Sequence, residues 1–522
     1  MRIFELLLLL SNAVLLALMI FSKSGKRRLL LFTASGISAI LAIIHGVVEG
    51  YRVQLLFPYV MTMVFLAVCG FNYFKSPAPR KIPRSLRVSI HAFTAVMLVV
   101  TAGLMYAFPV FKLPEPTGEF KVGTQTFHFV DANRDEIFDE ALEGKRELMV
   151  QVWYPAQNTN GKPSPFIPEE PLLEEEPLSK TMGLPAIVMD YLKYIPSHSY
   201  EKAELSTANP SYPLVILNHG YKSSRMYHTS QAENLASHGY IVASIDHTYS
   251  TFATVFPDGR TTTMKTDEDL IRETDYRDKV GKVWTDDVSF TLDQFERIHS
   301  GQLPTMFKGK LDLDHIGIFG HSFGGASAYD SSYDSRITAG IDLDGALYRY
   351  HDRAGVTKPF MFIFSESTFD RFNKVRQHYV HTDEELDAMG ATREEVEKET
   401  KNKEIQVGHI KNVANHGGPI LYIEDTEHYN FADVQFLTPI FKPLGLIGKI
   451  EPKRAASLIN AYTLDFFDKH LKGKGGTLLE GPNQKYPEVK YATSLFAKEK
   501  EVSVEGLPKK SFFFNSRKEP LK

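Results

Sequence analysis

Residues 314–326 read Asp-His-Ile-Gly-Ile-Phe-Gly-His-Ser-Phe-Gly-Gly-Ala. A short apolar run, 316–319, is followed by a G-x-S-x-G turn and then by small residues that can begin a helix. Strand, tight turn and helix in this order form the context that presents a nucleophilic serine at the top of a sheet. The turn needs glycine at 320 and 324, because side chains there would collide with the neighbouring strand and helix. The pattern predicts that Ser322 is a catalytic nucleophile.

Around this turn, apolar strand-like runs alternate with helical stretches. The predicted strands after the first antiparallel pair, 126–130 and 148–154, are 213–218, 240–246, 316–319, 337–343, 359–365 and 419–424. Such alternation indicates a mostly parallel sheet with helices on both faces, which binds ligands beyond the carboxyl ends of its strands.

A serine hydroxyl needs a base to remove its proton and an acid to orient that base. In this fold class the order along the chain is Ser, then Asp or Glu, then His. Asp344 ends the strand after the serine turn and lies nearer its carboxyl end than Asp342, which is the second choice. His428 follows the strand 419–424 by a three-residue loop, whereas most other later histidines lie in a charged insertion or before a strand. We therefore predict Asp344 as the acid and His428 as the base.

The oxyanion formed during such a reaction needs two N–H donors. The backbone N–H of Phe323 lies at a helix N-terminus, where negative charge is favoured. The second donor is expected from the loop after strand 213–218, and Tyr221 is preferred to Gly220. No metal or organic cofactor is expected. The only cysteine, Cys69, lies in an apolar run, which excludes a disulfide framework and a cysteine zinc site.

The first hundred residues have the composition of a membrane unit. Four apolar stretches, 4–21, 29–48, 53–72 and 88–109, each approach the roughly 20 residues with which a helix crosses a bilayer. Residues 1–111 carry eleven Lys or Arg and two Glu, a balance of +9 that leaves −13 for the rest of a chain whose total is −4. An acidic remainder argues against nucleic acid as a partner.

The loops between these stretches predict an orientation. The loops 22–28 and 73–87 are rich in Lys and Arg, whereas the loop between the second and third stretches holds only Glu49 and Arg52. By the positive-inside rule, the basic loops are cytoplasmic and everything after Pro109 is outside. We expect an integral, multi-pass protein of the cell membrane, with a four-helix transmembrane anchor over 1–110 and an extracytoplasmic catalytic domain over 111–522.

Two segments of the catalytic part are candidate lids. The segment 160–212 contains an apolar cluster, 184–195, that fits a flap over the site and fits a core helix equally well. The segment 369–413 is long, highly charged and helical in character, which is typical of an inserted cap rather than of an ordinary connection.

Several motifs resemble one enzyme family in combination. The segments 320–325, 343–344 and 428–433, together with 152–156 and 218–220, resemble the plasma-type (group VII) platelet-activating factor acetylhydrolases, and the resemblance covers residues 115–475. It implies an α/β-hydrolase fold and calcium-independent hydrolysis of esters, including short or oxidised sn-2 acyl groups of phospholipids. It also implies the triad roles for Ser322, Asp344 and His428. The four apolar stretches are not part of that family's catalytic unit.

These observations together predict a membrane-tethered serine esterase that acts on a lipid or another apolar ester. One alternative is an amidase or peptidase, because the same triad serves both reactions. The other is a non-catalytic sensor or scaffold in which the membrane helices do the main work.

Overall fold

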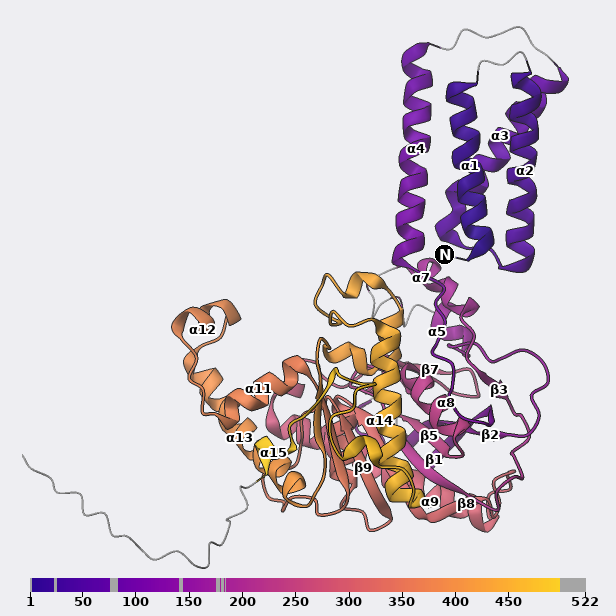
Figure 1. Cartoon of the computed structure of the whole chain (residues 1–522). Coiled ribbons are helices and arrows are strands. Elements are labelled where there is room, and N and C mark those ends of the chain that lie inside the picture. Colours follow the sequence, from indigo (N-terminus) through magenta and orange to yellow (C-terminus); the bar gives the residue numbers. More distant parts are fainter. Residues whose placement is uncertain are drawn as a thin grey trace, which may run out of the picture.

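The structure is a computed structural model, and it describes residues 2–22, 26–75, 83–139, 144–174, 179, 183 and 185–497. Parts of the basic loops 22–28 and 73–87, part of the segment 160–212, and the end of the chain from 498 to 522 lie outside the described residues. A bundle of long helices stands on one side of an α/β domain (Figure 1).

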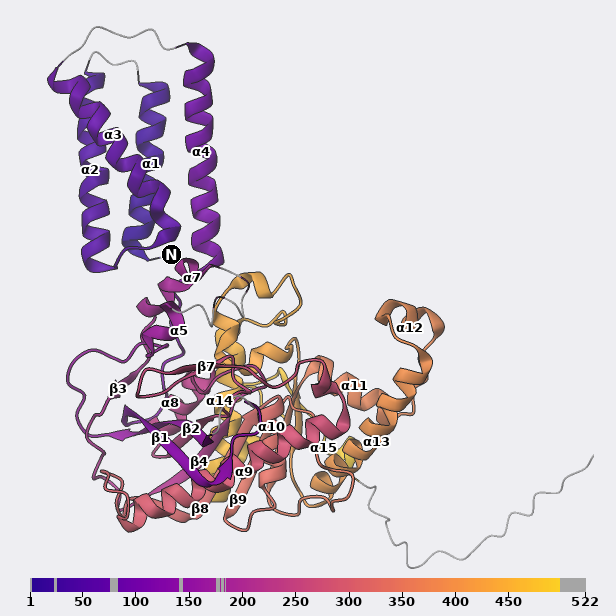
Figure 2. The ribbon, with the colours of Figure 1, turned by 180° about the vertical axis from the view of Figure 1, so that it is seen from behind.

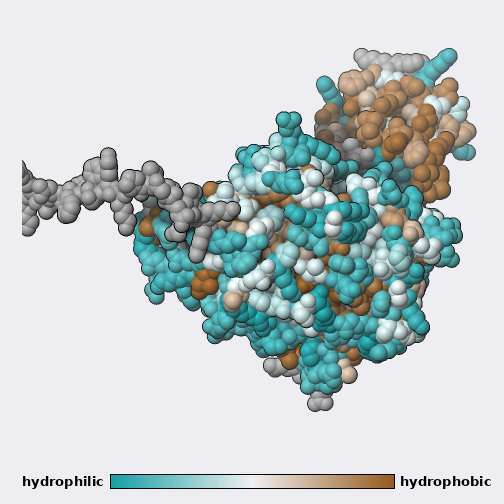
Figure 3. Space-filling model, turned by 60° about the horizontal axis from the view of Figure 1, so that its bottom comes forward, coloured by the Kyte–Doolittle hydropathy of each residue, from teal (hydrophilic) through white to brown (hydrophobic). Residues whose placement is uncertain are grey.

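The bundle contains the four apolar stretches. Its helices are α1 (Ile3–Phe21), α2 (Arg27–Val48), α3 (Leu56–Phe74), which follows the short η1 (Val53–Leu55), and α4 (Arg84–Ala107). All four are long and apolar enough to cross a membrane. Leu15, Met61 and Leu98 pack inside the bundle, while the outward side chains are also apolar and give it the brown surface seen in Figure 3. A surface of this kind favours lipid over water as its surroundings.

The α/β domain is built on one ten-stranded sheet with the strand order β12-β11-β10-β9-β8-β4-β5-β2-β1-β3. The strands are β1 (Lys121–Asp135), β2 (Lys145–Ala156), β3 (Ser199–Glu201), β4 (Tyr212–Asn218), β5 (Ile241–Asp246), β8 (Leu311–His321), β9 (Ile337–Leu343), β10 (Phe360–Ser365), β11 (Ile420–Ile423) and β12 (Val489–Tyr491). The central strands from β5 to β11 run parallel, and β2 and β12 join antiparallel on either side. The sheet is therefore mostly parallel, as the sequence predicts.

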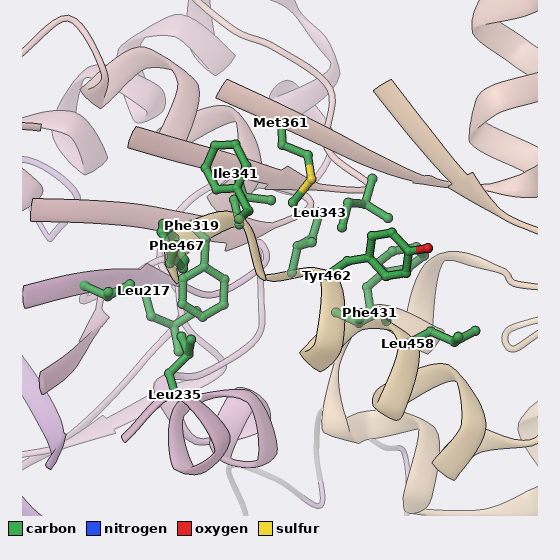
Figure 4. Close-up of a cluster of buried hydrophobic side chains, with 14 of the residues drawn as sticks. Leu217, Leu235, Phe319, Ile341, Leu343, Met361, Phe431, Leu458, Tyr462 and Phe467 are labelled. Carbon is green, nitrogen blue, oxygen red and sulfur yellow. The ribbon is translucent and has the colours of Figure 1, made fainter. Parts of the chain in front are cut away.

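Helices cover both faces of the sheet. One face packs against α8 (Thr229–Ser237) and α14 (Pro452–Lys472), and Figure 4 shows Leu235, Phe319 and Phe467 in the core between them. The other face packs against α9 (Thr274–Ser300) and α10 (Phe323–Ser331), which lie in front of the sheet in Figure 2. Alternate strand residues point to opposite faces, so the apolar runs of β4 and β8 supply both cores.

Shorter elements fill the connections. They are η3 (Arg225–His228), β6 (Ala253–Val255), β7 (Thr261–Thr263), η4 (Leu270–Arg272), η5 (His428–Phe431), η6 (Asp433–Phe436), η7 (Pro439–Phe441), η8 (Thr477–Leu479) and α15 (Thr493–Phe496).

The charged insertion 369–413 forms α11 (Glu366–Arg376), α12 (Asp383–Met389) and α13 (Arg393–Asn415). Phe372 of α11 and Ile410 of α13 are buried in one cluster with Phe364 of β10. Only α12 projects away from the domain (Figure 1). Most of this segment is therefore packed on the sheet, and the short α12 is the part that extends away from the domain.

Three short elements of the segment 160–212 lie between the domain and the bundle: α5 (Glu170–Glu174), α7 (Ala186–Met189) and η2 (Asp190–Tyr194) (Figure 1). The same segment also contributes β3 at the edge of the sheet. The amide Nε2 of Gln54 donates to the Val188 carbonyl at 2.8 Å, and the Tyr194 hydroxyl donates to the Tyr51 carbonyl at 2.8 Å. On its other side, Leu172 and Tyr191 share a buried cluster with Phe252 and Phe436, from loops beyond β5 and β11. The bundle and the sheet are thus joined through this segment.

Candidate active site

Ser322 occupies a strained turn between β8 and α10. Its backbone has φ 58° and ψ −121°, a region that residues other than glycine rarely adopt and that costs about 1–3 kcal/mol. A Cβ added to Gly320 would lie 2.2 Å from the Gly324 carbonyl oxygen, and one added to Gly324 would lie 2.3 Å from the Asn218 carbonyl oxygen. Both glycines are therefore required, because strand, turn and helix approach one another too closely for a side chain.

Three side chains from distant parts of the chain meet at this turn. The Oγ of Ser322 lies 2.9 Å from Nε2 of His428, and Nδ1 of His428 lies 2.7 Å from Oδ2 of Asp344. Asp344 follows β9 and His428 follows β11, so all three lie at the carboxyl ends of parallel strands. Such ends meet at one edge of a sheet. These are the three residues that the sequence predicts as nucleophile, base and acid.

Asp344 is held as a carboxylate. Its side chain is fully buried, and burial alone would raise its pKa. The hydrogen bond with His428 and the Ser365 N–H, which donates to Oδ1 at 2.6 Å, outweigh burial and hold the pKa below its ordinary value. An ionised carboxylate here can fix the orientation of the imidazole ring and stabilise its protonated form.

Asp342 has a different environment. Burial raises its pKa well above the ordinary value, and the Gly345 N–H, donating to Oδ1 at 2.7 Å, only partly opposes this effect. Its other oxygen, Oδ2, has no hydrogen-bond partner among the described residues. Burial in this setting favours the neutral form of the carboxyl group. It lies under the serine turn, against Gly325, and is not paired with a described histidine.

The two predicted oxyanion donors are the backbone N–H groups of Phe323, which follows Ser322, and of Tyr221, which lies in the loop after β4. Within the described part of the chain, neither the backbone N–H of Phe323 nor that of Tyr221 has an acceptor. The loop after β4, which carries Gly220 and Tyr221, passes close to Ser322. A Cβ added to Gly220 would lie 3.4 Å from Cβ of Ser322. The Tyr221 side chain points elsewhere and donates its hydroxyl to Oγ1 of Thr266 at 2.9 Å.

His219 fixes the peptide that carries the Tyr221 N–H, which sequence reasoning did not foresee. Its Nδ1–H donates to the Gly220 carbonyl at 2.6 Å, and its Nε2 accepts the His247 N–H at 3.2 Å. Burial holds the pKa of His219 well below the ordinary value, so the ring is neutral with one proton, as these two bonds require. Because C=O and N–H point in opposite directions in a trans peptide, holding the Gly220 carbonyl aims the Tyr221 N–H the other way.

A buried polar network packs against the loop that carries His219 and Tyr221. The Nδ1 of His247 donates to Oδ2 of Asp287 at 3.0 Å, and Arg146 binds Asp287 through two bonds of 3.1 and 2.7 Å. The Trp284 ring stacks on His247 at 3.9 Å between centroids and meets the Phe323 ring edge-on at 4.9 Å. The network therefore joins the two segments that carry the free N–H groups.

Among the described residues, one group has the composition of a metal site, and it lies in the bundle. Ligand atoms of Glu5, His45 and Glu49 lie within 4.8 Å of one another. However, Oε1 of Glu5 accepts from Arg52 at 2.7 Å and from Nε of Arg2 at 2.9 Å. Two guanidinium groups already neutralise the two carboxylates, so this cluster is an ion-pair network rather than a cation site.

The fold and the site define the class of the protein. A serine at a strained strand–helix turn, followed along the chain by a carboxylate and a histidine beyond later parallel strands, is the arrangement of an α/β-hydrolase. The family described as platelet-activating factor acetylhydrolase, isoform II, matches residues 105–481, and the chain belongs to this family. The predicted resemblance is confirmed, and the match begins where the bundle ends.

Individual relatives agree with the family. The chain is 27% identical over 416 residues to a probable 1-alkyl-2-acetylglycerophosphocholine esterase of Arthroderma benhamiae, covering 73% of this chain and 93% of the relative. It is 26% identical over 379 residues to the platelet-activating factor acetylhydrolase of Cavia porcellus, covering 66% and 79%. A solved ferulic acid esterase from Streptomyces cinnamoneus is similar in structure, with a TM-score of 0.56, 27% identity, and coverage of 73% of this chain and 98% of the esterase. The protein is a serine hydrolase of carboxylic esters.

Proposed function

We propose that Ser322, His428 and Asp344 form the catalytic triad of this esterase, and that its substrates are short-chain or lipid esters. The observation that carries the proposal is the unbroken series of hydrogen bonds from the Ser322 hydroxyl through the imidazole to the buried carboxylate. The three side chains come from three separate connections of the sheet, and a purely structural role does not require this alignment.

The mechanism follows from the geometry. Ser322 Oγ attacks the ester carbonyl carbon while Nε2 of His428 takes the hydroxyl proton, and Asp344 stabilises the resulting imidazolium. The N–H groups of Phe323 and Tyr221 bind the negatively charged oxygen. The C–O bond to the alcohol then breaks, and the alcohol leaves with the proton from His428. Water attacks the acyl-enzyme, gives a proton to His428, and releases the acid as that proton returns to Ser322.

His219 acts in this mechanism as a positioning residue for the Tyr221 N–H. We expect His219→Phe, which keeps the ring but removes the bond to the Gly220 carbonyl, to lower kcat about 10- to 100-fold with a much smaller change in KM. The physical reason is that an oxyanion donor acts mainly in the transition state. Steady-state kinetics on a p-nitrophenyl ester measure this split between kcat and KM.

The variant His219→Asn separates this role from simple destabilisation. An asparagine amide can still donate to the Gly220 carbonyl, so this variant should regain part of the lost kcat at a similar melting temperature. Equal kcat values for the Phe and Asn variants would show that the bond to Gly220 does not matter. A boronate transition-state analogue should bind more weakly to His219→Phe than to the wild type.

We also propose that the four-helix bundle over 1–110 is a membrane anchor and that the domain from 111 onward is extracytoplasmic. The described basic residues Lys26, Arg27, Arg28, Lys75, Arg84 and Arg87 lie at one end of the bundle and the catalytic domain lies at the other, which supports this orientation. The segment 160–212 would then be a lid held between the bilayer surface and the loops that surround Ser322. This placement favours an ester drawn from lipid as the substrate.

A substrate panel tests the function. Purified full-length protein should hydrolyse p-nitrophenyl acetate and butyrate and a phospholipid with a 2-acetyl group, and it should turn over the matched p-nitroanilides far more slowly. Anilide turnover equal to ester turnover would favour an amidase instead. An absence of turnover of every ester by folded protein would favour the sensor or scaffold.

A further inference from the structure

The end of the bundle that lies away from the catalytic domain carries six described basic residues: Lys26, Arg27, Arg28, Lys75, Arg84 and Arg87. Nine of the eleven Lys and Arg residues in 1–111 lie in the two stretches 23–28 and 75–87, and the sequence has no Asp or Glu in 6–48 or in 50–114. The two glutamates of the bundle, Glu5 and Glu49, lie at the other end beside Arg2 and Arg52. Both glutamates of the bundle therefore lie at the end next to the catalytic domain, and the described basic residues lie at the end that is uppermost in Figure 1.

A cavity of about 550 Å³ opens between the helices at the same end. Its polar lining consists of Arg27 and Arg28 from α2, Asn72 from α3, and Arg87 and His91 from α4. Its apolar lining consists of Met19, Leu31, Val68, Cys69 and Ile90. The volume lies within the range of about 300–1,000 Å³ that is usual for small-molecule sites. The cavity is therefore a positive site with an apolar wall, built from all four helices.

We propose that this cavity binds the phosphate headgroup of an anionic phospholipid. Arginine guanidinium groups bind phosphate oxygens bidentately, and arginines from two different helices line this cavity. One of them, Arg27, also donates from Nη2 to the Met19 carbonyl at 2.7 Å. The apolar wall would contact the glycerol and the first acyl carbons, which a free inorganic anion lacks. Basic pockets between membrane helices on the cytoplasmic side are a recurring form of such recognition. The proposal depends on the proposed function only in assigning this end to the cytoplasmic leaflet.

The chain offers a matched control for general surface charge. Lys26, Lys75 and Arg84 lie at the same end of the bundle, but they are not among the residues that line the cavity. Removing these three charges changes the net charge as much as removing Arg27, Arg28 and Arg87. A difference between the two triple variants therefore reports the cavity itself.

The test is native mass spectrometry of the full-length protein in a neutral detergent, titrated with phosphatidylglycerol or phosphatidylcholine. We expect the wild type to retain one phosphatidylglycerol in preference to phosphatidylcholine. Arg27→Gln/Arg28→Gln/Arg87→Gln should weaken this binding by about tenfold or more, whereas Lys26→Gln/Lys75→Gln/Arg84→Gln should keep it. The measurement does not depend on orientation in a membrane, and a fluorophosphonate reaction at Ser322 in the same samples reports the catalytic site separately.

Three results would overturn the proposal. One is an equal loss in both triple variants, which would mean that overall charge attracts the lipid. The second is equal retention of the two lipids by the wild type. The third is displacement of phosphatidylglycerol by millimolar glycerol phosphate, which would identify a soluble phosphate ester as the ligand. Normal fluorophosphonate labelling alongside any of these results would leave the esterase assignment intact.

Discussion

Ser322→Ala should abolish ester hydrolysis, with a fall in kcat of about 10⁴- to 10⁶-fold. Without the hydroxyl there is no acyl-enzyme, and only the oxyanion donors and the bound ester geometry remain to assist direct attack by water. The fold should persist, because the side-chain bond that the hydroxyl makes is the one to His428. Initial rates on p-nitrophenyl acetate, together with the melting temperature, measure both effects.

A matched control lies in α10, the helix that follows Ser322. Ser327 is buried in α10 and is not part of the triad, so Ser327→Ala should remain active. A fluorophosphonate probe with a charged, membrane-impermeant tag should label the wild type and Ser327→Ala, but not Ser322→Ala, on cells stripped of wall and outer envelope. Labelling of Ser322→Ala would refute the nucleophile assignment. Labelling of the wild type only after lysis would keep the esterase and reverse the orientation of the bundle.

The sequence predicts those site residues whose position follows from a local motif or from the end of a strand. Gly320, Ser322 and Gly324 lie within five consecutive residues, and their roles depend on a tight turn that the G-x-S-x-G motif specifies. Asp344 and His428 are far away, but each follows a recognisable strand, and parallel strands bring their carboxyl ends to one edge. A prediction based on strand ends therefore selects the residues that the structure brings together.

Other features of the structure depend on contacts between distant parts of the chain, which no local sequence pattern shows. Arg146 and Asp287 are 141 positions apart, and both are charged residues that a sequence analysis assigns to the surface. In α13 the buried Val407, Ile410 and Val413 recur at a helical spacing, but the many charges around them favour an exposed cap. The contact of Gln54 with Val188 depends on how the bundle sits on the domain. These features follow from tertiary contacts rather than from propensity.

The bundle also contacts the domain close in sequence to the site. The guanidinium of Arg52 lies over the Tyr191 ring at 5.2 Å, and Tyr191 belongs to the same buried cluster as Phe436, eight residues beyond His428. A series of packed side chains therefore connects the bundle with the segment that follows His428.

Asp344→Asn should lower kcat by about 10⁴-fold while leaving the fold intact. An asparagine can keep the approximate shape, but it cannot stabilise the imidazolium and can leave the His428 ring in the wrong tautomer. The surroundings of Asp344 hold its pKa below the ordinary value, so the wild type contributes a full negative charge that asparagine lacks. The measurement is kcat on p-nitrophenyl acetate at neutral pH.

Asp342→Asn is the control, because the two aspartates are two residues apart at the end of the same strand and the sequence ranks Asp342 as the second choice for the acid. Burial raises the pKa of Asp342 well above the ordinary value and so favours its neutral form, and we expect a neutral amide to replace it with at most about a tenfold effect on kcat. A loss in Asp342→Asn as large as that in Asp344→Asn would contradict the assignment of Asp344. Loss of activity in Asp342→Asn with a lowered melting temperature would instead indicate that the buried acid supports the turn that carries Ser322.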